Sequence, residues 1–266
     1  MTHLSIEALT ISTPEGELFA KQWIPPLLTG APIVLLHDSL GCVALWRDFP
    51  ERLATLSGRQ VIAYDRLGFG ASAPYPGKIL PDFILQEAQT GFKYVHERLG
   101  LKAFLVLGHS VGAGMAVGIA ARYQETCVGL VTLSAQAWVD VQIQSGIEAA
   151  RQHFAEPVQI ERLAKYHGDK APWVLNAWTE TWLSDEFREW TLDKILPHVH
   201  CPTLCLHGDQ DEYGSPTHSE HLARMTAGLS RAVTLRGCGH VPHRECPEEV
   251  ITQVKHFLYD PPLSGE

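Results

Sequence analysis

The chain of 266 residues is acidic, with 21 Lys and Arg against 30 Asp and Glu and a formal net charge of -9. Nucleic-acid binding needs clustered positive charge, so we do not expect nucleic acid as a partner. No apolar run approaches the roughly 20 residues of a membrane span, so we do not expect a membrane as a partner either. The length suits one large α/β domain with an insertion better than two equal domains. The first residues lack the basic and apolar regions of a signal peptide, which predicts a cytoplasmic protein.

Two kinds of apolar pattern predict the strands. Residues 4–13 and 16–23 alternate apolar and polar side chains around a Pro-Glu-Gly turn, as half-buried antiparallel strands do. The later runs are almost continuously apolar, which is typical of parallel strands that are covered on both faces. These runs span 32–37, 60–65, 103–108, 129–134, 202–208 and, more weakly, 232–237.

Helical patterns separate these apolar runs. They lie at about 81–99, 111–123, 217–227 and 247–258. Alternation of strand and helix predicts the α/β class, with a doubly wound and mostly parallel sheet. We expect the final residues, 261–266, to form a frayed tail.

One interval, between the runs at 129–134 and 202–208, is far longer than a crossover needs. It has the patterns of three or four helices, at about 139–154, 158–167, 171–183 and 184–196. We therefore predict a core domain of residues 1–135 and 199–266, and a helical cap inserted over residues 136–198. The cap should cover the carboxyl ends of the strands, where open α/β sheets bind ligands.

Five of the seven tryptophans fall in this cap or at its entrance: Trp138, Trp173, Trp178, Trp182 and Trp190. Such a set predicts an apolar or aromatic pocket, although each single tryptophan more often packs the cap onto the core than contacts a substrate.

The six cysteines have two interpretations. A zinc site built from Cys201, Cys205, Cys238 and Cys246 is conceivable, but the short-spaced pair is C-x-x-x-C and not the C-x-x-C of a zinc knuckle. The chain is also too long to need disulfides. Reduced and mostly buried thiols are the better interpretation, with no metal and no cofactor.

A nucleophile candidate stands in the Gly-x-Ser-x-Gly stretch of residues 108–112, directly after an apolar run and before a helical pattern. A serine hydroxyl is a weak nucleophile, so it must be exposed, aimed and deprotonated by a neighbour. A sharp strand-to-helix turn would hold Ser110 at the top of the sheet, and the flanking glycines would let strand and helix approach closely.

Such a serine needs an acid and then a histidine, each on a loop after a later strand. The loop after 202–208 offers Asp209, Asp211 and Glu212, and the loop after the last run offers His240 and His243. The histidine would take the serine proton, and the acid would orient the imidazole. Along the chain the serine, the acid and the histidine therefore follow one another in the order that this arrangement requires.

With these motifs the chain resembles the α/β-hydrolase superfamily, in its serine branch, over nearly its full length. The matching stretches are LLHDSLG, YDRLGFGAS, GHSVGAG, HGDQDEYGSP and GCGHVPHREC. The resemblance assigns the acid to Asp211, with Asp209 as runner-up, and the base to His240. It gives Asp65 and Arg66 structural roles, and it makes Asp209 and His243 supports of their loops.

The resemblance also implies an oxyanion hole formed by the backbone N–H groups of Val111 and Ser39. The family pattern after His37 is usually Gly, and Asp38 stands there instead. A carboxylate aimed into the hole would raise the barrier. We expect the Asp38 side chain to turn outward and accept bonds from nearby N–H groups or an imidazole, as a scaffold of the loop.

The expected function is a cofactor-free serine hydrolase that cleaves a carboxylic ester of a small apolar or aromatic molecule through an acyl-enzyme. Alternatives with the same triad are a C–C bond hydrolase of an aromatic ring-cleavage product, a thioesterase, a lactonase and a cofactor-free perhydrolase. Val241 follows His240, where the ring-cleavage group often has an aromatic residue, which slightly favours esters. A non-catalytic ligand-binding protein on this fold is another class, but the triad looks intact.

We expect the partner to be the small-molecule substrate, and the protein to be a possible homodimer. The expected substrate contacts are His37, Leu40, His109, Trp138, Trp178 and Trp182.

Overall fold

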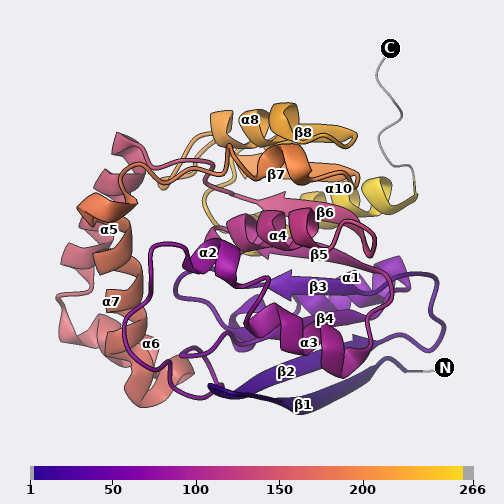
Figure 1. The fold of residues 1–266 in the computed structure, drawn as a ribbon, viewed down its shortest axis with the longest axis horizontal. Helices are drawn as coiled ribbons and strands as arrows, with labels where there is room; N and C mark the ends of the chain where they lie inside the picture. Colours follow the sequence, from indigo (N-terminus) through magenta and orange to yellow (C-terminus); the bar gives the residue numbers. More distant parts are fainter. Residues whose placement is uncertain (1–2, 260–266) are drawn as a thin grey trace.

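Eight strands form one sheet in residues 3–259, the part of the chain that the computed structural model describes (Figure 1). The strands are β1 (Ser5–Thr13), β2 (Gly16–Ile24), β3 (Ile33–Leu36), β4 (Val61–Tyr64), β5 (Phe104–His109), β6 (Cys127–Leu133), β7 (Thr203–Gly208) and β8 (Ser230–Leu235). Their order is β1-β2-β4-β3-β5-β6-β7-β8. β2 pairs antiparallel with β1 and β4, and the other neighbours are parallel. The predicted fold class is therefore confirmed.

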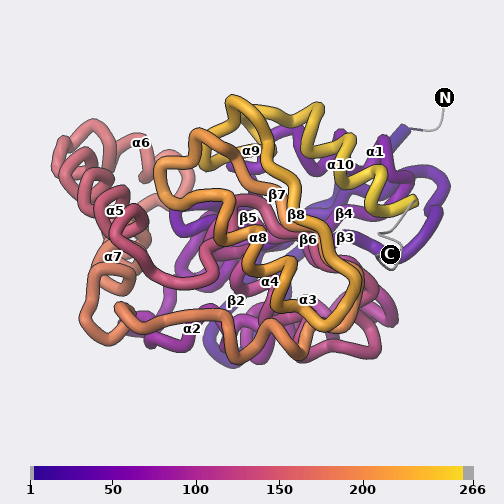
Figure 2. The backbone as a smooth tube through the Cα atoms, turned by 90° about the horizontal axis from the view of Figure 1, so that it is seen from above, coloured from indigo at the N-terminus to yellow at the C-terminus, as the bar shows by residue number. Residues whose placement is uncertain are grey.

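Helices cover both faces of this sheet (Figure 2). The α-helices are α1 (Phe49–Ser57), α2 (Phe83–Gln86), α3 (Gly91–Leu99), α4 (Val111–Arg122), α5 (Val141–His153), α6 (Pro157–His167), α7 (Ala171–Trp182), α8 (Thr217–Met225), α9 (Pro242–Glu245) and α10 (Pro247–Tyr259). α1 and α10 pack on one face through residues such as Leu53 and Val254. α3, α4 and α8 pack on the other through Phe92, Val117 and Leu222.

The central strands explain the continuous apolar runs. Every residue of β3, β4 and β5 is buried, because helices cover both faces of a parallel sheet and leave no solvated side. β1 lies at the edge of the sheet and is mostly exposed over its first half. The carboxyl ends of the parallel strands therefore meet at one edge, where the loops after β3, β5 and β7 come together.

The interval between β6 and β7 folds mainly as α5, α6 and α7, which Figure 1 shows grouped beyond one end of the sheet. The helix expected at 184–196 is not present. That segment holds only two short 3-10 turns, η3 (Asp185–Phe187) and η4 (Leu196–His198). Between them Thr191 forms an isolated β-bridge with Trp138, and Leu192 N–H donates to the Ala137 carbonyl at 2.8 Å. The backbone around Thr191 thus bonds to the start of the insertion and does not form the hydrogen bonds of a helix.

The single helix expected at 81–99 is also interrupted. It divides into α2 and α3, with a break at Thr90, whose φ and ψ are -113° and -106°. The buried Glu87 carboxylate accepts a bond from the Tyr64 hydroxyl at 2.6 Å. A side chain at Gly91 would meet that carboxylate, since an added Cβ would lie 2.3 Å from Glu87 Oε1. The break between α2 and α3 thus lies beside a buried bond to β4 that is distant in sequence.

The cysteines are free thiols, and all but Cys246 are buried. The Sγ atom of Cys201 lies 3.9 Å from that of Cys127. Within residues 3–259, no group of three or more potential ligands converges as a metal site would require. The zinc set of Cys201, Cys205, Cys238 and Cys246 is thus not assembled.

None of the described helices has the length and apolar character that a membrane span needs. The tail expected at 261–266 lies outside the described residues.

Candidate active site

Ser110 lies on a sharp turn between β5 and α4. Its φ is 54° and its ψ is -124°, a strained conformation for a residue with a side chain. The turn is tight because an added Cβ on Gly108 would lie 2.1 Å from the Gly112 carbonyl oxygen, and one on Gly112 would lie 2.3 Å from the Leu36 carbonyl oxygen. Only glycine permits these approaches, so the two flanking glycines allow β5, α4 and the end of β3 to meet.

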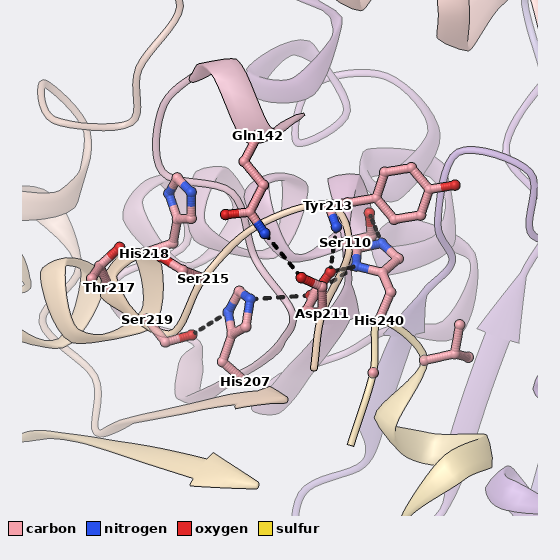
Figure 3. A network of polar contacts seen from close by, with 12 residues as sticks. Ser110, Gln142, His207, Asp211, Tyr213, Ser215, Thr217, His218, Ser219 and His240 are labelled. Carbon is pink, nitrogen blue, oxygen red and sulfur yellow. Dashed lines mark hydrogen bonds and ion pairs between the residues drawn. The ribbon is translucent and has the colours of Figure 1, made fainter. Parts of the chain in front are cut away.

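The structure brings Ser110 together with the expected base and acid. The Ser110 Oγ lies 3.0 Å from His240 Nε2, and His240 Nδ1 lies 2.9 Å from both carboxylate oxygens of Asp211 (Figure 3). This arrangement requires the tautomer in which Nδ1–H donates to Asp211 and Nε2 accepts from the serine hydroxyl. An imidazole held this way can take a proton from the serine.

Asp211 has a second histidine partner that the sequence analysis did not identify. His207 lies on β7 with its Nε2 3.1 Å from Asp211 Oδ2, while its Nδ1 lies 3.1 Å from Ser219 Oγ (Figure 3). The Tyr213 N–H also donates to Asp211 Oδ1 at 2.7 Å. Burial alone would raise the pKa of Asp211, but its contacts with His207 and His240 hold it well below its usual range. The carboxylate therefore stays ionised and fixed.

Asp209, the runner-up acid, is engaged elsewhere. Its Oδ1 accepts a bond from the Gly237 N–H at 2.7 Å, and the residue is exposed. Its contact joins the loop after β7 to the loop after β8, which is the supporting role expected of it.

The Asp38 carboxylate is bonded within its own loop. Its Oδ1 accepts from the Leu40 N–H at 2.8 Å, and its Oδ2 lies 3.2 Å from His109 Nδ1. The other ring nitrogen of His109 lies 2.7 Å from the His240 carbonyl oxygen. Burial would raise the pKa of Asp38, but the contacts with His109 and Leu40 hold it well below its usual range. Asp38 thus links the loop after β3 to the loop that carries His240.

Ser39 and Val111, the expected oxyanion donors, lie along the same narrow cavity. The close approach of Gly112 to the end of β3 places the first turn of α4 beside the loop that carries Ser39. The N–H of Val111 opens the helix and therefore has no partner within it. Ser39 and Val111 thus line one cavity beside the end of β3, and their role as oxyanion donors stays a prediction.

Asp65 and Arg66 brace this edge of the sheet. The Asp65 carboxylate accepts bonds from the N–H groups of Val43 at 2.6 Å and Ala71 at 2.7 Å. Burial raises the pKa of Asp65 to about 6, although those bonds oppose the shift. Arg66 Nη2 donates to the Asp38 carbonyl at 2.8 Å. Arg66 also packs over the Phe69 ring, so both residues hold loops at this edge of the sheet.

Ser110 and His240 open into a cavity of about 210 Å³, which we call the catalytic cavity. It lies between the strand ends and helices α5 and α7. Four of the expected contacts line it: Leu40, His109, Trp178 and Trp182. The sequence analysis did not expect several other lining residues to contact the substrate, because they come from the loop after β6, from α5 and from the segments near Asp211 and His240: Gln136, Ile143, Ile147, Tyr213, Val241 and His243.

Two expected contacts, His37 and Trp138, lie outside the lining of the catalytic cavity. His37 is buried, and its Nε2 accepts a bond from the Arg66 N–H at 3.1 Å. Trp138 packs its ring 4.1 Å from that of His218 and pairs with Thr191. Both side chains help to hold the loop after β3 and the base of the insertion, and their contact with a substrate stays a prediction.

A family model described as the alpha/beta hydrolase family matches residues 33–253, which include Ser110, Asp211 and His240. The match covers most of the chain, so the protein belongs to this family.

Among curated proteins, Serine hydrolase BPHL of Mus musculus is 28% identical over 236 residues, covering 85% of this chain and 78% of that protein. Lipase 1 of Psychrobacter immobilis is 22% identical over 278 residues, covering 96% of this chain and 84% of that protein. Among solved structures, a thermophilic esterase from Thermogutta terrifontis superposes with a TM-score of 0.72 at 24% identity, covering 95% of this chain and 98% of that one. At that identity the last likeness establishes the fold alone.

Proposed function

We propose that this protein is a serine hydrolase that cleaves carboxylic esters carrying a small apolar or aromatic group. The observation that carries the proposal is the line of contacts from Asp211 through His240 to Ser110, which ends in the catalytic cavity. A hydroxyl activated in this way attacks carbonyl carbon.

In the proposed reaction, Ser110 Oγ attacks the ester carbonyl while His240 Nε2 takes its proton. The N–H groups of Val111 and Ser39 stabilise the negative charge on the carbonyl oxygen. His240 then gives the proton to the departing alkoxide, which leaves an acyl group on Ser110. Water, deprotonated by His240, attacks the acyl carbon, and collapse of the second intermediate releases the acid and restores the serine hydroxyl.

The lining of the catalytic cavity supports an apolar or aromatic substrate. Trp178 and Trp182 of α7 and Ile143 and Ile147 of α5 present mainly apolar surface to it. A cavity of about 210 Å³ favours a compact substrate around the reacting bond. The similarity to proteins named serine hydrolase and lipase supports ester chemistry as the first candidate, ahead of the C–C hydrolase, thioesterase, lactonase and perhydrolase alternatives. The free thiols are consistent with the proposed cytoplasmic location.

The test is a substrate panel of p-nitrophenyl esters, acyl-CoA thioesters and a ring-cleavage dienoate, run with the native protein, Ser110→Ala and Ser134→Ala. Ser134 is a matched control because it is also a buried serine with a positive φ, 49°. We expect ester turnover in the native protein and in Ser134→Ala, and its loss in Ser110→Ala. Thioester or dienoate turnover far above ester turnover would contradict the proposed substrate class, and activity surviving in Ser110→Ala would contradict the mechanism.

A further inference from the structure

Two further cavities lie next to one another on one side of the catalytic cavity. A narrow one of about 10 Å³, which we call the neck, shares three lining residues with the catalytic cavity: Ser39, Trp178 and Trp182. A larger one of about 180 Å³, which we call the distal cavity, shares four with the neck: Arg66, Phe69, Ile79 and Phe83. The three cavities are therefore neighbours, and the small neck lies between the two larger ones.

The position of His240 decides which part of an ester would enter the neck. The leaving alkoxide must lie within reach of His240, because that residue protonates it. His240 and Val241 line the catalytic cavity but not the neck, whereas Ser39 and Val111 do line the neck. With the carbonyl oxygen directed at Ser39 and Val111, the alcohol group lies beside His240 and the acyl group points into the neck.

The lining of the distal cavity suits an apolar chain. Met115 lies one helical turn after Val111 on α4, so the two share a face of the helix, one lining the neck and the other the distal cavity. Leu18, Leu67 and Phe69 add further apolar surface.

The two buried charged groups at this cavity each have a partner, although the Nε of Arg66 has none among the described residues. Glu87 accepts the Tyr64 hydroxyl at 2.6 Å, and Arg66 donates to the Asp38 carbonyl at 2.8 Å. The exposed residues Glu15 and Thr90 belong to the lining of the distal cavity, so this cavity is not a packing void enclosed in the core.

We propose that the neck and the distal cavity form an acyl subsite, which takes a linear, apolar acyl chain of medium length from an ester with a small alcohol group. The proposal rests on the proposed function and specifies its substrate class. The neck, as the narrowest part, selects unbranched chains, and the distal cavity holds the methylenes beyond it.

The test compares p-nitrophenyl acetate, butanoate and octanoate in the native protein, Ile79→Trp and Leu80→Trp. Ile79 is half-buried and lines both the neck and the distal cavity, so a tryptophan there fills the path. The control, Leu80, is the next residue and is 62% exposed. Each buried methylene contributes about fourfold in affinity, so we expect octanoate to exceed butanoate at least tenfold in kcat/KM, and Ile79→Trp to remove that preference. Leu80→Trp should keep it.

A binding measurement separates this proposal from the ester chemistry. Octanoate and butanoate are titrated into Ser110→Ala by calorimetry, with and without Ile79→Trp. Octanoate should bind at least tenfold more tightly than butanoate, and the added Ile79→Trp change should abolish the difference. If this preference is seen but no ester is hydrolysed, the proposed function fails and the subsite stands. If esters are hydrolysed with the same chain-length profile in all variants, the subsite is refuted and the proposed function stands.

Discussion

The Asp38 carboxylate occupies a loop position where the family usually has glycine, and its removal should weaken both the fold and the reaction. In Asp38→Ala the Leu40 N–H loses its acceptor and His109, which is 1% exposed, loses its carboxylate partner. A lost hydrogen bond costs about 1 kcal/mol, and a buried polar group without a partner costs about 1–3 kcal/mol. The Asp38 side chain is 28% exposed, so water can replace part of its contacts. We therefore expect Asp38→Ala to lower the free energy of unfolding by about 2–3 kcal/mol.

For a domain of this size, such a loss lowers Tm by roughly 4–6 °C. The effect on the reaction comes through Ser39, which follows Asp38 directly. Removal of one oxyanion donor lowers kcat by about 10²–10³-fold. In Asp38→Ala the Ser39 N–H is displaced but still present, so the loss should be smaller. We expect kcat to fall roughly 10–100-fold, with a small change in KM.

The assay combines thermal unfolding with kcat and KM on a short p-nitrophenyl ester. Asp38→Asn is the matched variant, because its amide oxygen can still accept the Leu40 N–H and its amide nitrogen can face His109. It should lie between the native protein and Asp38→Ala in both Tm and kcat. Native Tm and kcat in Asp38→Ala would refute the scaffold role, and a rise in kcat would mean that the carboxylate opposes the oxyanion.

Three other changes test the site. Asp211→Asn should lower kcat by about 10³–10⁴-fold, whereas the kcat of Asp209→Asn should stay within a few-fold of the native value in the same ester assay. The opposite result would make Asp209 the acid of the triad. His207→Gln should lower kcat about tenfold with KM little changed, since it loosens the Asp211 carboxylate; an unchanged kcat would refute a positioning role. Burial lowers the pKa of His218 to about 4, so between pH ~6.5 and ~4 the unfolded chain binds a proton there that the folded chain does not. The free energy of unfolding, measured with urea, should therefore fall as pH drops through that window, and less steeply in His218→Gln; equal slopes would contradict this.

The strands of the sheet could be predicted from sequence because burial on both faces leaves an uninterrupted apolar run, as in β5. Ser110 could be located because the tight turn around it demands glycines at fixed spacing. Asp38 could be assigned to the loop because a carboxylate in a tight turn has nearby N–H groups to bond.

Features that depend on contacts distant in sequence could not be predicted in this way. The break before Gly91 lies beside the bond between Glu87 and Tyr64, and the extended path at Thr191 pairs with Trp138. The second partner of Asp211 and the distal cavity likewise arise only when separate loops meet. The sequence around His207 does not differ from that of a buried histidine without such a contact, so a single sequence does not reveal its contact with Asp211.

The most direct test of the central claim, that Ser110 is a nucleophile activated by His240, is intact-protein and peptide mass spectrometry after mixing with diethyl p-nitrophenyl phosphate. One diethylphosphoryl group should attach to the peptide containing Ser110, with one equivalent of p-nitrophenolate released. The adduct should be absent in Ser110→Ala and form far more slowly in His240→Ala. Labelling at another residue, or equal labelling of Ser110→Ala, would contradict the account.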